Sequence, residues 1–190
     1  LVIPIGEWVM SHACKQLVEW LQAGKAPIGM AVNLSALQFE NPEMHAIFKR
    51  IIQNSGIDPQ LLTLEVTESI LLGEIEKKIE LMKRLKDLGL KLSIDDFGTG
   101  YSSLRYLKRL PLDELKIDRS FFVNLFEDTK GRSLLSSLIL LARNLNLRTV
   151  AEGVETEQQL LFLQKERCDQ YQGLLFKPPL EGGEVFKLLS

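Results

Sequence analysis

The chain has 190 residues, of which 45% are hydrophobic and 25% are charged, and its 23 Lys and Arg against 25 Asp and Glu give a formal net charge of −2. This is the composition of a globular protein with a sizeable core, and the balanced charge argues against sequence-independent binding to long nucleic acid. No run approaches the ~18 apolar residues of a membrane span, and the start lacks the basic flank and cleavage site of a signal peptide, so we expect no membrane contact by this domain.

The cysteine and histidine residues do not suggest a zinc site. Cys14 and Cys168 lie far apart and match no zinc-ligand spacing, so we expect reduced core cysteines. Reduced cysteines favour a cytoplasmic location, either alone or as the cytoplasmic domain of a membrane-anchored parent. His12 and His45 fall on predicted helices, and we expect both on helix surfaces.

Hydrophobic periodicity predicts alternating helices and strands from one end of the chain to the other. Apolar residues at helical spacing from Trp8 to Leu21 predict the first helix, which Gly24 would end. Strands are predicted at residues 28–33, 61–68, 90–94, 112–117, 148–154 and 168–174. Helices are predicted at residues 42–55, 75–88, 104–110 and 134–145, after a capping box at residues 156–159, and around residue 185.

Six strand-and-helix repeats of this kind predict a parallel α/β fold with right-handed crossovers, either an open doubly wound sheet or a barrel. In an open sheet the ligand collects at one switch point, whereas nearly every strand of a barrel can offer a residue to the site. Polar residues end all six strands, which favours a modified (β/α)8 barrel of the TIM type. Because such a barrel needs about 250 residues, we expect it to be incomplete here, with its first two strands missing. The polar strand ends are Asn33, Glu65, Asp95 with Asp96, Lys116, Glu152 and Gln172.

The adjacent pair Asp95 and Asp96 is the most informative feature of the chain. The alternating run of residues 90–94 predicts a half-buried strand, and Gly98 and Gly100 predict a sharp turn just after the pair. Neighbouring strand residues point to opposite faces, so both aspartates can reach one site only if the strand bends. The alternative is that they only cap the turn.

The polar strand ends carry oxygen ligands that suit Mg²⁺ or Mn²⁺ better than zinc. Four carboxylates on one face would repel one another strongly, and a single lysine cannot neutralise them, so metal binding is the better interpretation than a structural ion-pair network. A rim that holds two cations can bind an anionic phosphate and activate a water for in-line attack. The four carboxylates are Glu65, Asp95, Asp96 and Glu152, and the lysine is Lys116.

Six short strings, in order along almost the whole chain, resemble the successive signatures of the EAL domain family. The strings occupy residues 33–35 (NLS), 65–68 (EVTE), 95–104 (DDFGTGYSSL), 115–118 (LKID), 151–155 (AEGVE) and 172–173 (QG). The resemblance implies one EAL-type domain over residues 1–190, corresponding to its C-terminal three quarters. It implies hydrolysis of cyclic di-GMP to linear pGpG with two Mg²⁺ or Mn²⁺ ions. It further implies a homodimer through the loop after Asp96, and GGDEF or sensor domains in the parent protein.

The resemblance also assigns metal ligands. Asn33, Glu65 and Asp95 would hold the first ion, and Asp96 and Glu152 would serve the second. This set contains the four carboxylates already selected by their positions and adds one amide. The adjacent pair Asp95 and Asp96 is therefore the expected bridge between the two ions.

The remaining residues of the strings have expected roles in catalysis and substrate binding. Lys116 would position the attacking water and stabilise charge on the phosphorus centre, and either Lys116 or Glu152 could act as the general base. Gln172 would lie near the substrate, together with Asn33 and Lys116. Glu68 would anchor the loop after Asp96, and Glu155 would support the rim. For these last two, capping of a helix start is an equal alternative.

The chain contains no Glu-Ala-Leu tripeptide, the motif that names the family. Residues 1–9 resemble the family segment downstream of that motif, so we expect the motif's glutamate ligand to be absent and the isolated chain to have little activity, although its parent would be active. The alternative function is a non-catalytic cyclic di-GMP receptor. A third interpretation, another Mg²⁺-dependent barrel enzyme, is allowed by the carboxylate rim alone.

Overall fold

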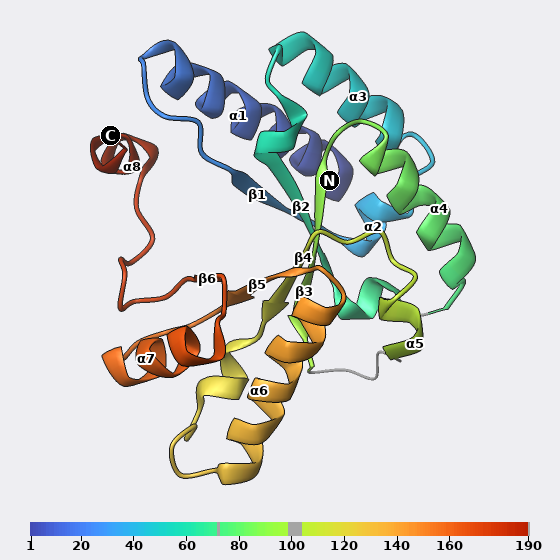
Figure 1. Cartoon of the computed structure of the whole chain (residues 1–190). Helices are drawn as coiled ribbons and strands as arrows, with labels where there is room; N and C mark the ends of the chain where they lie inside the picture. The colour runs from blue at the N-terminus through green and yellow to red at the C-terminus, as the bar shows by residue number, and fades with distance from the viewer. Residues whose placement is uncertain (72, 99–103, 190) are drawn as a thin grey trace. The chain divides into compact units, whose positions relative to one another are not determined.

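The computed structural model describes residues 1–71, 73–98 and 104–189, and the chain forms two compact units (Figure 1). The first unit comprises Leu1–Leu92 together with Leu180–Ser190, and the second comprises Ser93–Pro179. Among the described residues, the helices are all too short or too polar to cross a membrane.

The first unit is built on two parallel strands. Strands β1 (Met30–Leu34) and β2 (Leu62–Thr67) pair so that Asn33 lies opposite Glu65. Its helical elements are α1 (Val2–Gln22), α2 (Ala36–Phe39), α3 (Met44–Ser55), η1 (Pro59–Leu61), η2 (Glu68–Leu71), α4 (Ile75–Lys86) and α8 (Gly182–Leu188).

Helices α1 and α3 lie side by side and supply much of the core of this unit (Figure 1). Cys14 and Leu17 of α1 and Phe48 of α3 are almost fully buried, and removing such side chains from water is the main force that holds the helices in place. Helix α8 attaches to the same unit, because Lys25 lies over the Phe186 ring, 4.7 Å from its centroid.

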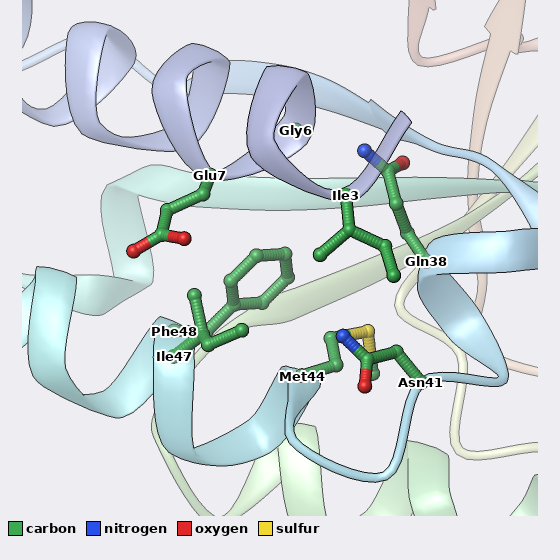
Figure 2. A pocket seen from close by; sticks show the side chains of 8 residues that line it. All are labelled: Ile3, Gly6, Glu7, Gln38, Asn41, Met44, Ile47 and Phe48. Carbon is green, nitrogen blue, oxygen red and sulfur yellow. The ribbon is translucent and has the colours of Figure 1, made fainter. Parts of the chain in front are cut away.

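The side chain of Gln38 joins α1 to the short helix α2. Its Nε2 donates to the Val2 carbonyl (3.0 Å), and its Oε1 accepts from the Ser35 backbone N–H (2.8 Å), which completes a capping box. Figure 2 shows Gln38 beside Ile3 at a small hollow that Phe48 of α3 also lines. The sequence pattern did not predict α2, since four residues are too few for a helical period.

The second unit is built on four strands that pair in parallel in chain order. They are β3 (Lys91–Phe97, from Ser93 onwards within this unit), β4 (Glu114–Ile117), β5 (Arg148–Ala151) and β6 (Gln170–Tyr171). The helical elements are α5 (Leu104–Leu107), η3 (Arg119–Phe122), α6 (Thr129–Asn144) and α7 (Glu157–Glu166). The carboxyl ends of adjacent parallel strands meet at one edge, and this edge carries the candidate site.

The predicted alternation of six strands with helices is confirmed in the described residues. The boundaries differ where local chemistry dominates: α6 begins at Thr129 rather than residue 134, because Asp128 caps it by accepting from the Lys130 backbone N–H (2.9 Å). Cys14 is buried as expected, but Cys168 is only half-buried, so its prediction as a core residue is wrong. Burial nevertheless raises the pKa of both thiols.

A side-chain clasp attaches the short strand β6 to β5. The buried Thr149 donates to Asp169 Oδ2 through both its backbone N–H (2.8 Å) and its hydroxyl (2.9 Å), and the Asp169 backbone N–H donates to Thr149 Oγ1 (3.1 Å). Only two residues of β6 pair with β5, so the clasp reinforces a short ladder.

We predict that Thr149→Val lowers the free energy of unfolding by about 2 kcal/mol, because it leaves the Asp169 N–H without its acceptor. Thr149→Ser keeps the hydroxyl and is expected to cost about half as much. Urea denaturation followed by far-UV circular dichroism measures both; equal losses for the two variants would show that the clasp contributes little.

Candidate functional site

A bulge in β3 places both Asp95 and Asp96 opposite Lys116 of β4. In the pairing of β3 with β4, Ile94 lies opposite Leu115 and Phe97 lies opposite Ile117, so the two aspartates together face the single residue Lys116. Asp96 has φ 55°, in the left-handed region that aspartate tolerates better than most residues. The expected bend is therefore confirmed, and it has the form of one extra residue in the strand.

Three carboxylates converge at this bulge. Asp95 and Asp96 of β3 and Glu152, the residue after β5, each offer an oxygen, and these atoms lie within 4.8 Å of one another. The side chain of Asp95 is 13% exposed and that of Glu152 is 16% exposed, so solvent screens their charges only partly. Such a set of hard oxygen donors fits a Mg²⁺ or Mn²⁺ ion.

The ammonium of Lys116 lies between two of these carboxylates. Its Nζ is 3.0 Å from Asp95 Oδ1 and 2.7 Å from Glu152 Oε1, and only 6% of its side chain is exposed. Gln172 supports the same glutamate, because its Nε2 donates to Glu152 Oε1 (2.6 Å). Asp95 Oδ1 also accepts from the Asp96 backbone N–H (3.0 Å). Asp95 therefore makes a local backbone contact and is a member of the carboxylate cluster as well.

Burial and neighbouring charges raise the pKa values of two of these carboxyl groups. Burial, and then the charges of Asp95 and Asp118, raise the pKa of Asp96, against a smaller opposing effect of Lys116. Burial also raises the pKa of Glu152, while the hydrogen bond and charge of Lys116 oppose the rise. Both carboxylates are therefore destabilised in their charged forms, as expected where several acids share too little positive charge.

Asp118 is a charged neighbour to which the sequence pattern assigned no role. It follows β4 directly, its charge acts on Asp96, and its Oδ1 accepts from the Ser120 backbone N–H (2.9 Å) at the start of η3. Its position at the carboxyl end of a strand is the same signal that selected the other acids. Extending the strand-end rule to the residue directly after β4 would have selected Asp118 as well.

The remaining predicted residues lie in several places. Asn33 and Glu65 are in the first unit, where they are opposed on β1 and β2; Asn33 is exposed and Glu65 is buried. Glu68 is buried at the start of η2. Glu155 is exposed just before α7, and its backbone N–H donates to Gln159 Oε1 (2.8 Å) beside the predicted capping box, which is confirmed at Thr156. The ligand and supporting roles of these residues stay predictions.

Part of the predicted loop after Asp96 falls outside the described residues, namely residues 99–103. The homodimer through this loop therefore stays a prediction, as do the turn at Gly100 and the cytoplasmic location.

One family model matches almost the whole chain, including all six strings. The sequence model described as the EAL domain matches residues 1–179. This chain belongs to the EAL domain family. The bifunctional diguanylate cyclase/cyclic di-GMP phosphodiesterase MucR of Pseudomonas aeruginosa is 45% identical over 185 residues, which are 97% of this chain and 27% of MucR. The cyclic di-GMP phosphodiesterase NbdA of the same organism is 42% identical over 180 residues, which are 95% of this chain and 23% of NbdA. The chain thus spans about a quarter of the length of these curated relatives.

Solved EAL structures have the same fold as this chain. The PaMucR phosphodiesterase in its c-di-GMP complex matches with a TM-score of 0.92 at 43% identity, over 97% of this chain and 74% of that one. BlrP1 of Klebsiella pneumoniae, in a manganese/cy-diGMP complex, matches with a TM-score of 0.82 at 28% identity, over 95% of this chain and 45% of that one. The predicted fold class, a parallel α/β fold like that of EAL barrels, is confirmed.

We predict that Lys116→Met raises the pKa of Glu152 further in the metal-free protein. The substitution removes the cation that opposes the effect of burial, so the folded-state pKa moves further above the unfolded value and stability falls more steeply as the pH rises through that interval. Carbon-13 NMR titration of the Glu152 carboxyl measures the shift, with the exposed Lys108→Met as the control. An unchanged pKa of Glu152 would mean that the ammonium does not govern its charge.

Proposed function

We propose that this chain is the site-bearing part of a phosphodiesterase that hydrolyses cyclic di-GMP to linear pGpG by a two-metal mechanism. The observation that carries the proposal is the cluster of Asp95, Asp96 and Glu152 around Lys116, in a member of a family whose named relatives include cyclic di-GMP phosphodiesterases. The substrate is a phosphodiester anion, and a purely acidic cluster would repel it, so cations are required.

Asp95, Asp96 and Glu152 are the residues of the second unit that would hold Mg²⁺ or Mn²⁺, and Asn33 and Glu65 are the ligands predicted in the first unit. Such ions supply a polarised phosphoryl oxygen and a water of lowered pKa. The bulge supports this assignment, because it directs two neighbouring carboxylates toward Lys116 where a regular strand would separate them onto opposite faces.

Lys116 has a role that does not depend on the identity of the ion. Its ammonium is held by Asp95 and Glu152 and is almost excluded from water, so it presents a fixed positive charge where negative charge develops on the phosphoryl oxygens. Glu152, whose pKa is raised by burial, can accept a proton more readily than an exposed glutamate. Gln172 orients this carboxylate through its hydrogen bond.

The partners follow from the same proposal. Cyclic di-GMP is the ligand, and the relative MucR is a diguanylate cyclase as well as a phosphodiesterase, so a GGDEF or sensor domain is the expected neighbour in the parent protein. The proposed homodimer would form through the loop after Asp96.

We predict that Asp95→Asn and Glu65→Gln abolish hydrolysis of cyclic di-GMP by the full-length protein that carries this chain. Each substitution removes one negative charge from the proposed ligand set. We expect Lys116→Ala to lower kcat more than it changes KM, because its contact strengthens in the transition state. Chromatographic separation of pGpG from substrate, with Mn²⁺ present, measures all three.

The control variant is Glu157→Gln, an exposed glutamate in the first turn of α7, which should keep normal turnover. Unchanged turnover in Asp95→Asn would contradict the proposed function. Tight binding of cyclic di-GMP without any hydrolysis by the unchanged full-length protein would support the receptor alternative instead.

A further inference from the structure

The short turn η3 lies directly against the backbone that follows two of the clustered carboxylates. A Cβ placed on Gly98 would lie 2.6 Å from Phe121 Cζ and 2.7 Å from its Cε2, and a Cβ placed on Gly153 would lie 2.6 Å from Arg119 Cβ. Both glycines have positive φ, 97° and 66°. Gly98 is two residues beyond Asp96, and Gly153 directly follows Glu152, so one turn contacts the chain just beyond both acids.

We propose that η3 is a positioning wedge whose Phe121 ring, packed on Gly98, holds the Asp96 carboxylate in the metal-binding geometry. Arg119, packed on Gly153, sets the position of Glu152 in the same way. The proposal rests on the proposed function in one respect, namely that the cluster binds divalent ions. The Phe121 ring offers no metal-ligand atom, so it would act through the backbone of the bulge.

The backbone of Asp96 requires such support. Its φ of 55° is unfavourable for a residue with a Cβ, and its carboxylate is repelled by those of Asp95 and Glu152, whose oxygens lie within 4.8 Å. Relaxation of Asp96 into the extended region would restore the regular alternation of the strand and turn its side chain toward the opposite face. The Phe121 ring fills the space directly beside Gly98, two residues beyond Asp96, and so restricts the backbone there.

The wedge is itself fixed from three sides. Asp118 caps its start by accepting from the Ser120 N–H, and Phe122 is buried with 4% of its surface exposed. Gln159 Nε2 donates to the Phe122 carbonyl (3.3 Å), and the same side chain completes the capping box of α7. The segment after β5 and the wedge therefore share one anchor, which ties the position of η3 to the strand end that carries Glu152.

Binding of Mn²⁺ to this chain, measured by electron paramagnetic resonance of the free ion, tests the proposal without any need for catalysis. We expect Phe121→Ala to raise the Kd for Mn²⁺ by about tenfold or more, as loss of a supporting group does at other metal sites, and Phe121→Leu to have a smaller effect in the same direction. Val123→Ala, in an exposed residue just after the same turn, should leave the Kd unchanged. Leu138→Ala, which removes a buried side chain of α6, should lower Tm but not the affinity of the folded protein.

The outcomes separate the wedge from the metal site. If Phe121→Ala binds Mn²⁺ as the unchanged chain does, while Asp96→Asn loses binding, the wedge is wrong and the metal site stands. If the unchanged chain binds no Mn²⁺, both are wrong. Should Phe121→Ala not fold, Phe121→Leu retains an apolar contact while withdrawing the ring edge from Gly98, and a Kd equal to that of the unchanged chain would then overturn the wedge.

Discussion

The organisation of the candidate site depends on one interaction, the ammonium of Lys116 held between the carboxylates of Asp95 and Glu152. Three carboxylates with oxygens within 4.8 Å of one another repel at close range, and partial burial strengthens that repulsion. One cation relieves only part of it, and burial first, then the neighbouring carboxylate charges, raise the pKa values of Asp96 and Glu152. A site of this kind is electrostatically prepared for divalent cations.

The backbone creates this electrostatic situation. Parallel pairing places the ends of β3, β4 and β5 side by side, and the bulge adds a second aspartate opposite Lys116. The proposed wedge η3 then occupies the space against the glycines that follow the bulge and β5. Repulsion between the acids and the left-handed backbone of Asp96 thus oppose this arrangement, and the packing of Phe121 supports it. In the proposed phosphodiesterase, divalent cations held by this cluster would allow an anionic substrate to bind at an acidic rim.

The sequence predicted the members of the cluster better than their contacts. Strand ends can be located from hydrophobic alternation, and a polar residue at such an end is the signal that selected Asp95, Asp96, Lys116 and Glu152. The contact between Gln172 and Glu152 joins residues from two strand ends, so it depends on register, which alternation alone does not set. The direction of the bulge, the clasp between Thr149 and Asp169 and the packing of Phe121 on Gly98 likewise arise from tertiary packing. The same strand-end rule could have predicted Asp118, whereas Phe121 is apolar and lies away from a strand end, so the rule could not select it.

The most direct test of this account is a crystal of the chain soaked in Mn²⁺ and studied by anomalous diffraction. We expect a manganese peak within coordination distance of oxygens of Asp95 or Asp96, with Asp96 still in its left-handed conformation. A fully soaked crystal with no anomalous peak at the cluster would contradict it.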